Sequence, residues 1–377
     1  MARLSVRAFR NLADADLELP AAGMVLVGPN GHGKTSLLEA LLYLEVFRSF
    51  RGARDRELVR FGEDGFRVEA ETDGRSDGGS GVARRQVEQW LPEARGEGQT
   101  VSAGYDARTR EKRVVVDGLQ AERLADAIGS VRGVVLSPSD VQLATGGARV
   151  RRGFVDVLLA LVVPGYVAAL GEYRRALRHR CRATMGDVAD WEALLARSGA
   201  KVAAARRLWV ERWAPRYSEH CAEIGETLEA GLCYASRATE GEEELAAALE
   251  RSRERDMVRG TTSVGPHRDD LRLLLGGRDL GVYGSAGQWR TAALALRLIE
   301  AETLAGGDGG DGLPLICLDD AFAELDSERS ARLGRLVEGL AARGSQVFAT
   351  VPREGEMPEA VSALPRWRIR EGQIEAA

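Results

Sequence analysis

The sequence predicts an α/β fold with a β-rich N-terminal part and an inserted α-helical lobe. Near the N-terminus, a glycine-rich loop at Gly28–Gly33 follows an apolar run and precedes a helical pattern. A second apolar run, Pro314–Leu318, ends in two aspartates. Between them, from about Val150 to Glu254, the pattern turns helical and is rich in Ala, Leu, Arg and Glu. Strand and helix signals lie on both sides of this helical segment. They indicate one α/β domain into which the helical segment is inserted.

The first 150 residues are predicted to form strands around one helix. Leu4, Val6 and Phe9 begin a strand, and Met24–Val27 is wholly apolar, as expected of a buried strand. Ser36–Phe47 has apolar residues at helical spacing. Further strands are predicted at Phe66–Glu71, Val101–Tyr105, Lys112–Val116 and Val134–Leu136.

Strand signals return after Gly260. The predicted elements there are a strand at Leu271–Leu275, a helix at Gln288–Leu304, a strand at Pro314–Leu318, a helix at Ser327–Ala342, and strands at Gln346–Thr350 and Trp367–Arg370. Within the helical lobe, Pro164 and Pro215 are expected to interrupt helices, because proline removes a backbone donor. We therefore expect a body of residues 1–150 and 257–377 around a helical lobe of residues 151–256.

Composition excludes several classes of protein. Of the 377 residues, 44% are hydrophobic and 29% are charged, which is typical of globular proteins. No apolar run reaches the roughly 18 to 20 residues that a membrane span needs. The four cysteines form no CxxC pair, and the N-terminus lacks an apolar signal segment. We expect a cytoplasmic protein with reduced cysteines.

Charge is distributed unevenly along the chain. The whole chain has a net charge of −5, yet the stretch Arg149–Arg216 contains 14 Lys or Arg and 6 Asp or Glu. Clustered arginines neutralise nucleic-acid phosphates without reading sequence. Arg174, Arg178 and Arg182 are spaced to share one helix face. The candidate DNA-binding residues are Arg151, Arg152, Arg174, Arg178 and Arg182.

The loop after the first buried strand fits the pattern GxxxxGK[ST]. Its glycines let backbone N–H groups surround phosphate oxygens, and the following helix N-terminus attracts anions. Lys34 is expected to reach the β- and γ-phosphates, and the Thr35 hydroxyl to ligate Mg²⁺. Lys34 is one of only three lysines in the chain, with Lys112 and Lys201. The expected phosphate-binding residues are Gly28, Pro29, Asn30, Gly31, His32, Gly33, Lys34, Thr35 and Ser36.

The apolar run that ends in Asp319 and Asp320 is expected to complete this site. In proteins with such a phosphate loop, a carboxylate at the end of a buried strand supplies the second metal-binding group. Asp319 is therefore a candidate Mg²⁺ ligand, directly or through water. Asp320 occupies the position of a general base that polarises the attacking water. Together with Lys34, these two aspartates are the predicted catalytic residues.

The segment Ser285–Arg290 precedes a predicted helix with small residues and a glycine, which is typical of an anion site. It is similar to the signature motif of ABC-type ATPases, which binds the γ-phosphate of ATP held by a second subunit. This resemblance implies that Ser285, Gly287 and Gln288 bind nucleotide across a dimer. The segment Asp319–Asp326, which includes Glu324, resembles the D-loop of the same proteins, which crosses the dimer interface.

Further segments resemble the RecF/SMC branch of ABC-type ATPases, and the RecF family in particular. The opening, Leu4-x-Val-x-x-Phe9-Arg10-Asn11-Leu12, is similar to the start of that branch. Segments that resemble the RecF family lie at Arg48–Arg51, Asp55–Gly62, Ser137–Asp140, Arg151–Asp156, Tyr173–Arg178 and Gly260–Asp270. The resemblance runs from residue 4 to about residue 351, nearly the whole chain.

This resemblance implies an ABC-type ATPase head with a helical lobe in place of a long coiled coil. It implies ATP and Mg²⁺ as cofactors, ATP-dependent homodimerisation and weak, DNA-stimulated ATP hydrolysis. It further implies binding to duplex DNA and single-strand/double-strand junctions or gaps, and recombinase loading together with RecO and RecR. Arg10 and Asn11 are expected to contact nucleotide. Trp289 departs from the family, which usually has a second glutamine there.

The sequence disfavours three other function classes. A non-hydrolysing homologue is disfavoured because Lys34, Thr35 and Asp319 are all present. A transporter ATPase subunit is disfavoured by the helical insertion and by Thr350, which stands where transporters place a histidine. An ATPase coupled to a nuclease is disfavoured because few residues follow Asp326, too few for a separate acidic metal-binding domain. DNA repair and recombination therefore remains the expected role.

Overall fold

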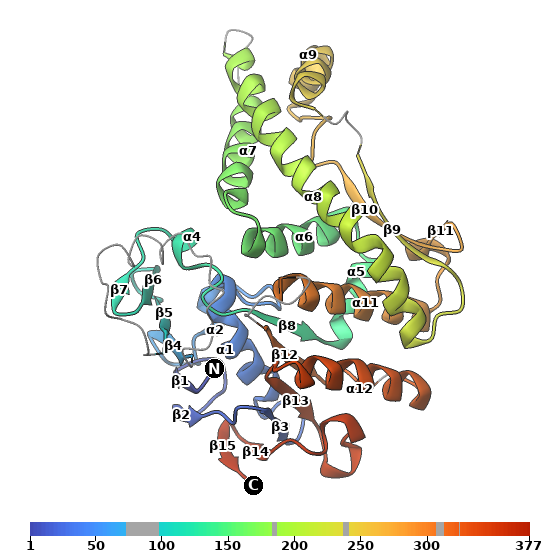
Figure 1. Cartoon of the computed structure of the whole chain (residues 1–377). Coiled ribbons are helices and arrows are strands. Elements are labelled where there is room, and N and C mark those ends of the chain that lie inside the picture. Colours follow the sequence, from blue (N-terminus) through green and yellow to red (C-terminus); the bar gives the residue numbers. More distant parts are fainter. Residues whose placement is uncertain (73–97, 183–186, 237–240, 307–312, 324) are drawn as a thin grey trace. The chain divides into compact units, whose positions relative to one another are not determined.

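A computed structural model describes residues 1–72, 98–182, 187–236, 241–306, 313–323 and 325–377. The chain divides into two compact units (Figure 1). The first unit contains Met1–Ser139 and Glu300–Ala377, and the second contains Asp140–Ile299. The expected helical lobe of residues 151–256 lies within this second unit, which also includes the strand and helices that follow it. The predicted α/β fold with a β-rich N-terminal part and a helical insertion is confirmed.

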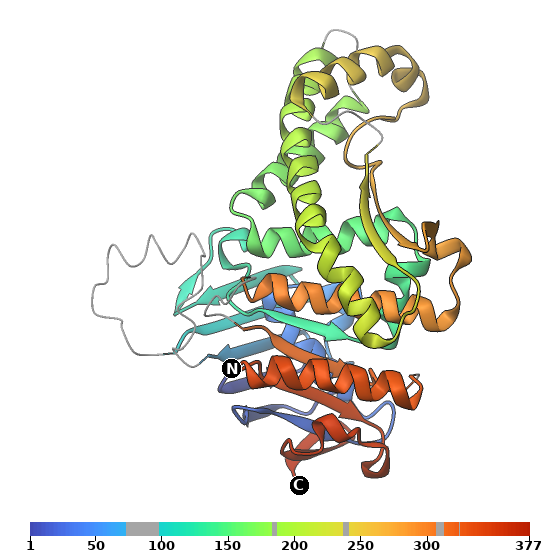
Figure 2. The same ribbon diagram turned by 45° about the vertical axis from the view of Figure 1, so that its right-hand side comes forward.

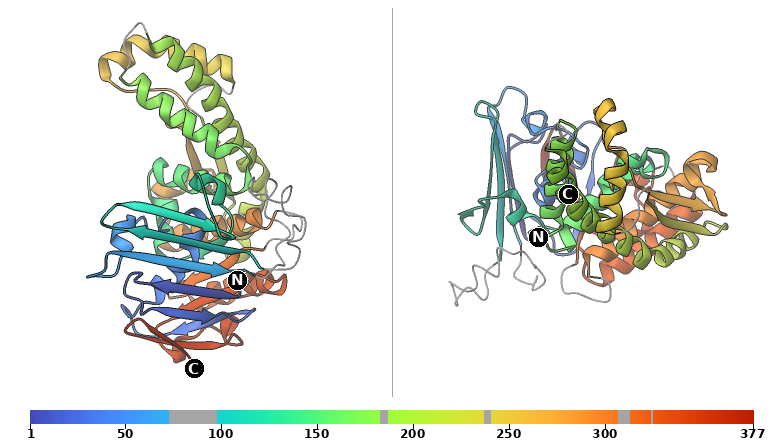
Figure 3. Two further views of the ribbon diagram at one scale, coloured as in Figure 1. Left: turned by 90° about the vertical axis from the view of Figure 1, so that its left-hand side faces the viewer. Right: turned by 90° about the horizontal axis from the view of Figure 1, so that it is seen from above.

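An antiparallel sheet of the first unit has six strands among the described residues, in the order β2-β1-β4-β5-β6-β7 (Figure 3, left). Its strands are β1 (Arg3–Arg7), β2 (Ala15–Glu18), β4 (Gly65–Glu71), β5 (Thr100–Asp106), β6 (Glu111–Val116) and β7 (Leu119–Gln120). Side chains alternate along β4 between buried and exposed, as in a sheet with one face in a core. Two short helices belong to this unit, α2 (Asp55–Leu58) and α4 (Leu124–Ala127).

A second sheet of the first unit is mainly parallel, with the order β15-β14-β3-β13-β12-β8. Its strands are β3 (Gly23–Val27), β8 (Gly133–Leu136), β12 (Leu315–Asp319), β13 (Val347–Val351), β14 (Arg366–Arg370) and β15 (Gln373–Ala376). β3, β8 and β13 are buried throughout, as their short apolar runs predicted. The strand β13 separates β3 from β12, so it lies between the two strands that carry the predicted phosphate and metal groups.

Helix α1 (Lys34–Val46) packs against both sheets of the first unit. It contacts β4 and β5 of the antiparallel sheet and β8, β12 and β13 of the other. Its surface is apolar almost all round, and Leu37, Leu41 and Leu44 are fully buried in a core shared by the two sheets. The remaining helical elements are α12 (Ser327–Ala342), which is visible in Figure 2, and the 3₁₀ turns Glu354–Glu356 and Glu359–Val361.

The second unit is mostly helical. Its helices are α5 (Val141–Thr145), which follows a 3₁₀ turn at Pro138–Asp140, α6 (Ala148–Val162), α7 (Tyr166–Arg180), α8 (Val188–Ile224), α9 (Glu242–Arg259), α10 (Leu280–Tyr283) and α11 (Ala286–Leu304). α7 and α8 pack side by side along their length (Figures 1 and 2). α11 begins in this unit and ends in the first. No helix of the described segments is long and apolar enough to cross a membrane.

Two features of the second unit differ from the sequence prediction. Pro215 does not interrupt a helix but lies inside the 37-residue helix α8, because packing of α8 against α7, α9 and β9 outweighs the lost backbone hydrogen bond. The region that we expected to be helical up to Glu254 also contains a strand, β9 (Ala230–Ala235). β9 pairs with β10 (Asp270–Leu275), which also pairs with β11 (Arg278–Asp279). Pairing over such a separation leaves no local signal.

Candidate functional site

The glycine-rich loop connects β3 to α1 in the first unit. Gly31 and Gly33 have φ angles of 82° and 110°, which favour glycine. A Cβ atom at Gly28 would lie 2.4 Å from the carbonyl oxygen of Ile369, a clash that no side chain could relieve. The loop is therefore a close-packed backbone turn at the N-terminus of a long helix. Its N–H groups and the helix dipole favour a bound anion.

The Lys34 ammonium lies over this loop. It donates hydrogen bonds to the carbonyl oxygen of Gly28 at 2.6 Å and to Oδ1 of Asn30 at 3.1 Å. Burial lowers the pKa of Lys34, while the carboxylates of Asp320 and Asp319 oppose that effect. Because its acceptors are uncharged, the ammonium can exchange them for phosphate oxygens at little electrostatic cost.

The end of β12 lies against the start of α1. The hydroxyl of Thr35 donates a 2.9 Å hydrogen bond to Oδ1 of Asp319, although the two residues are 284 positions apart. Thr350, on the intervening strand β13, has its hydroxyl oxygen 3.2 Å from the same carboxylate oxygen. Burial raises the pKa of Asp319, and the bond from Thr35 opposes this effect. Thr35 and Asp319, the two predicted metal ligands, are thus adjacent.

Asp320 follows in a strained backbone conformation. Its φ is 49°, in the left-handed region that residues other than glycine rarely adopt. Its backbone N–H donates to the hydroxyl oxygen of Thr350 at 3.0 Å. Thr350 therefore contacts both aspartates, a role that its sequence position alone did not reveal. Its placement follows from the strand order, which inserts β13 between β3 and β12.

Residues of the N-terminal segment support the loop from outside. The side-chain amide of Asn11 donates to the carbonyl oxygen of Gly31 at 2.9 Å, and its Oδ1 accepts a hydrogen bond from Ser36 at 2.8 Å. The ring of His32 accepts the N–H of Glu371 through Nδ1 at 3.0 Å. Asn11 therefore braces the loop, and His32 connects it to the turn between β14 and β15.

Arg10 is held beside this loop by a buried carboxylate. Its Nε and Nη2 atoms each donate to Glu39, at 2.8 Å, and the Glu39 side chain is fully buried in α1. Ser49 also donates to Glu39, and Arg51 lies 3.8 Å from it. We did not anticipate Glu39 or Arg51 as site residues. A carboxylate on the buried face of a predicted helix is the signal that could have indicated Glu39, because such groups are almost always paired.

These residues surround one open pocket of about 510 Å³, a size suited to a small ligand. The residues that line it are Arg10, Asn11, Asn30, Gly31, Gly33, Lys34, Thr35, Ser36, Arg51, Glu57, Val59 and Asp320. Of the predicted site residues in this unit, Gly28, Pro29, His32 and Asp319 are not among the lining residues. They shape the loop or hold Thr35 from behind.

The donor set at Thr35 and Asp319 fits Mg²⁺. One hydroxyl and one carboxylate oxygen already lie within hydrogen-bonding distance of each other, and both are hard oxygen ligands. Across the described part of the chain, no cluster of three or more His, Cys, Asp or Glu side chains could hold a metal by itself. A cation here would therefore share its coordination with phosphate and water, which is how Mg²⁺ is commonly bound.

The predicted signature residues lie in the second unit, at the start of α11. The Ser285 hydroxyl accepts the N–H of Gln288 at 3.4 Å, and Oε1 of Gln288 accepts the N–H of Ser285 at 2.9 Å. This reciprocal pair is a capping box. It leaves the hydroxyl proton of Ser285 and the backbone N–H of Gly287 available to a ligand.

Trp289, next to the predicted signature residues, and Asp326 of the predicted D-loop both stabilise helices. The Trp289 indole N–H donates to the carbonyl oxygen of Leu280 at 2.8 Å, so this residue anchors α11 to α10. Asp326 caps α12 by accepting the N–H of Arg329 at 2.9 Å. Glu324 of the predicted D-loop lies outside the described residues.

The five candidate DNA-binding arginines fall into two groups. Arg151 forms a bidentate ion pair with Asp270, at 2.9 and 2.8 Å, and Arg152 donates to the carbonyl oxygen of Asp269. Arg174 is exposed, with Nη2 3.2 Å from Asp156. Arg178 and Arg182 are also exposed, and the described ranges contain no ion pair of either. The first two arginines hold the unit together, whereas Arg174 and Arg178 face solvent on α7. The prediction that Arg182 shares their helix face is wrong, because α7 ends at Arg180 and Arg182 lies in the turn that follows.

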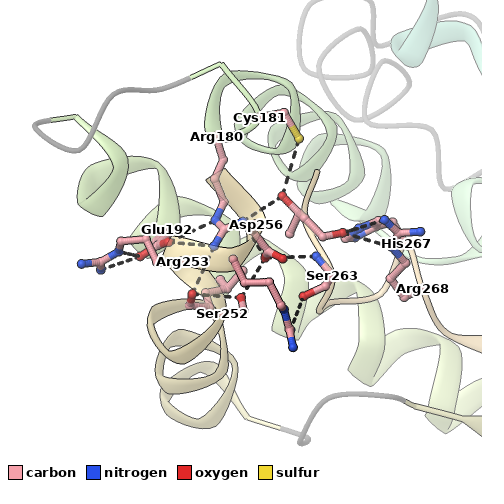
Figure 4. Close-up of polar contacts among 12 residues, drawn as sticks. Arg180, Cys181, Glu192, Ser252, Arg253, Asp256, Ser263, His267 and Arg268 are labelled. Carbon is pink, nitrogen blue, oxygen red and sulfur yellow. Dashed lines mark hydrogen bonds and ion pairs between the residues drawn. The ribbon is translucent and has the colours of Figure 1, made fainter. Parts of the chain in front are cut away.

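The Gly260–Asp270 segment joins a buried polar network (Figure 4). Arg180 of α7 donates to Glu192 of α8 at 2.9 Å and to Asp256 of α9 at 3.1 Å. The carbonyl oxygen of Thr262 accepts from the ring Nε2 of His267 at 2.9 Å and from Arg268. Three contacts join this segment to the helices around it: Arg180 of α7 donates to the Thr262 hydroxyl, Arg206 of α8 donates to the Pro266 carbonyl, and Asp256 of α9 accepts the N–H of Ser263.

The chain is similar to proteins of one group along almost its whole length. The RecF/RecN/SMC N terminal domain family matches residues 1–374. The DNA replication and repair protein RecF of Myxococcus xanthus (strain DK1622) is 36% identical over 365 residues, covering 92% of this chain and 89% of that protein. The protein of the same name from Anaeromyxobacter sp. (strain K) is 38% identical over 364 residues, covering 92% and 91%.

Solved structures agree with these sequence relatives. The recombination mediator protein RecF with ATP, from the RecFOR pathway, has a TM-score of 0.85 and 27% identity, covering 100% of this chain and 96% of that chain. An Smc head bound to the C-terminal winged-helix domain of ScpA has a TM-score of 0.56 and 14% identity, covering 100% and 96%. The second similarity shows a shared fold.

Proposed function

The chain belongs to the RecF family, whose fold is that of an ABC/SMC-type ATPase head, and we propose that it is an ATP-operated DNA-binding protein of recombination and DNA repair. In this proposal, ATP joins two copies of the chain around duplex DNA near a single-strand junction or gap. Slow, DNA-stimulated hydrolysis then reopens the pair. The observation that carries the proposal is the 2.9 Å hydrogen bond between Thr35 and Asp319, which joins the phosphate-binding loop to the strand with the predicted metal-binding carboxylate.

Four side chains of the site, together with the loop N–H groups, have a defined part in this mechanism. The loop N–H groups and Lys34 bind the β- and γ-phosphates, with Lys34 leaving the Gly28 carbonyl to do so. Thr35 and Asp319 would hold Mg²⁺, which would neutralise charge that develops on the phosphates. Asp320 orients the attacking water and takes its proton.

The second half of the site is proposed to come from another copy of the chain. The helix α11 N-terminus presents the Ser285 hydroxyl and the Gly287 N–H toward the γ-phosphate. Because the capping box orders these groups before ATP arrives, little entropy is lost when they bind. Trp289 keeps α11 in place through Leu280 and need not contact ATP.

DNA is proposed to bind the exposed arginines of the second unit, which we take as the helical lobe of the family. Arg174 and Arg178 face solvent on α7, and Arg182 is exposed just after the helix ends, so each can neutralise a phosphate. Arg151 and Arg152 are excluded from that role because their charges are directed at Asp270 and the carbonyl of Asp269. RecO and RecR are proposed partners, because the similar solved structure is a mediator of the RecFOR pathway.

The test is the molecular mass in solution with and without Mg-ATP. Wild-type protein should become a dimer only with ATP, and Lys34→Ala should remain monomeric because it cannot hold the phosphates. Ser285→Asp distinguishes the capping of α11 from the proposed contact with ATP of the other copy. Aspartate caps helices as well as serine does, but its charge repels a phosphate. It should fold normally and remain a monomer, whereas Ser285→Thr should dimerise. Dimerisation of Ser285→Asp with ATP would refute the shared site.

A further inference from the structure

Lys112, one of the three lysines, lies on β6 of the antiparallel sheet and is mostly buried. Its side chain is 15% exposed. The ammonium donates a 2.6 Å hydrogen bond to the carbonyl oxygen of Phe47 and lies 2.9 Å from Oδ2 of Asp55. It also lies 5.3 Å from the centre of the Tyr43 ring, a distance at which a cation is attracted to the ring face. All of these groups are in the first unit.

The two polar contacts mark the two ends of one loop. α1 ends at Val46, and Phe47 follows with a φ of 55°, a conformation that phenylalanine rarely adopts. α2 begins at Asp55. Lys112 therefore connects the end of α1 to the start of α2 and spans residues 48–54 between them. A positive charge at a helix C-terminus is also favourable for the carbonyl groups there.

That loop forms part of the wall of the nucleotide pocket. Ser49 accepts the backbone N–H groups of Arg51 and Ala53 and donates to Glu39, so the middle of the loop is fixed to α1. Arg51 lines the pocket, as does Glu57 just beyond the loop. Arg51 lines the same pocket as Lys34 and Thr35. The loop thus places a cation close to the metal and phosphate end of the pocket.

We propose that Lys112 is a positioning residue for the nucleotide pocket, which holds both ends of the 48–54 loop so that Arg51 faces the bound phosphates. The proposal rests on the proposed function, because it assumes that this pocket binds ATP. Lys112 itself does not line the pocket and acts through Arg51. A compact ammonium suits the position, since one atom serves a carbonyl, a carboxylate and a ring face at once.

Asp55 connects the start of α2 to α1 as well, through Tyr43. Its Oδ1 accepts a 2.8 Å hydrogen bond from the hydroxyl of Tyr43, and its Oδ2 faces Lys112. Among the described residues, removing the Lys112 charge therefore leaves Asp55 with the Tyr43 hydroxyl as its side-chain donor and the Phe47 carbonyl with no side-chain donor. Both ends of the loop would loosen together, while the Thr35 and Asp319 contact remains intact.

The experiment compares Lys112→Met with Arg113→Met, the next residue on β6, whose side chain is 71% exposed. Calorimetric titration with Mg-ATP should show about tenfold weaker binding for Lys112→Met, the loss expected when one charged contact to a phosphate is misplaced. Arg113→Met should match the wild type. Lys112→Arg keeps the charge but replaces the compact ammonium by a larger planar fork, so its affinity for Mg-ATP should lie between that of the wild type and that of Lys112→Met. Amide hydrogen exchange across residues 49–54 should become faster in Lys112→Met alone.

The outcomes separate this proposal from the proposed function. If Lys34→Ala also binds Mg-ATP as the wild type does, the pocket is not an ATP site and the proposed function fails. If Lys34→Ala loses binding but folded Lys112→Met binds as Arg113→Met does, Lys112 only stabilises the sheet and the positioning role is refuted. Asp55→Asn provides a second variant, since it keeps the Tyr43 bond and removes the charge. It should weaken Mg-ATP binding about threefold and accelerate exchange of the same loop.

Discussion

Replacing Arg180 by methionine removes the cation at the centre of the polar network in the second unit. The Arg180 side chain is 2% exposed, and it donates hydrogen bonds to Glu192, Asp256, Thr262 and the carbonyl oxygen of Leu249 (Figure 4). Methionine has a similar length and no charge, so the substitution removes these bonds with little change in volume.

The expected loss of stability depends on which carboxylates lose their only cationic partner when Arg180 is removed. Removing one member of a buried ion pair costs about 3 to 5 kcal/mol, because the other charge stays buried and unpaired. Glu192 keeps a second cation, Arg253, at 2.7 Å. Asp256 keeps only Ser252 and the N–H of Ser263. One uncompensated carboxylate, that of Asp256, remains. We therefore expect the free energy of unfolding to fall by an amount near the lower limit, about 3 kcal/mol.

The pKa of Asp256 gives a second readout. Burial alone would raise this pKa, but hydrogen bonds from Ser263, Ser252 and Arg180 outweigh burial and hold it below 3.8. The stability that this carboxylate contributes is present above pH 3.8 and is lost as the pH falls through its folded-state value. In Arg180→Met the pKa of Asp256 should rise, so the variant should lose less stability than the wild type on acidification.

The assay is native-state hydrogen exchange of amides in α7 and α9, because a chain of two units need not unfold in one step. Arg175→Met is the matched control, since Arg175 is exposed on the same helix. Mg-ATP binding by the first unit should be unchanged in both variants. A loss of less than 1 kcal/mol in the free energy of unfolding would refute the argument from an uncompensated Asp256. A loss of ATP binding at full stability would mean that this network serves the nucleotide rather than the fold.

Three other variants test separate parts of the molecule. Asp320→Asn should lower phosphate release by about 10²- to 10⁴-fold while ATP binding is retained, and equal loss of both would exclude a role as general base. Burial lowers the pKa of His267, although its hydrogen bond to Thr262 opposes this effect. The unfolded chain therefore binds more protons than the folded chain below about pH 6.5, and the free energy of unfolding falls as the pH drops. His267→Gln should reduce that slope, by at most about 1.4 kcal/mol per pH unit in thermal unfolding followed between pH 7 and 5. Arg178→Glu with Arg182→Glu should reduce the salt dependence of DNA affinity by a slope of about 0.9 per lost phosphate contact, and an unchanged slope would place the DNA elsewhere.

Much of the phosphate loop was predictable because its determinants are consecutive residues. An apolar run, a set of glycines and Lys34 fix a strand, a turn and a helix start by local backbone preferences. The pairing of Thr35 with Asp319 could be expected from the two motifs together. The part of Thr350 could not, because it depends on β13 lying between β3 and β12.

In the second unit, tertiary packing outweighed two local sequence preferences. Pro215 was expected to break a helix, yet α8 continues through it because neighbouring helices and β9 pack along its length. β9 itself was not predicted, since its partner β10 follows after a helix. In both cases the deciding interactions connect residues that are distant in the chain, whereas propensity describes only neighbours.

The sequence by itself determined the fold class, the family and the chemistry of the phosphate and metal groups, because those depend on residue types at fixed short spacings. Only the tertiary structure decided which charges are free. Arg151 and Arg178 are the same residue type in the same basic stretch, but Arg151 pairs with Asp270, 119 positions away, and Arg178 faces solvent. Lys112 likewise acquires its role from Phe47 and Asp55, which approach it only when the antiparallel sheet packs on α1. A charge acts through its nearest neighbours in space, and these are set by folding.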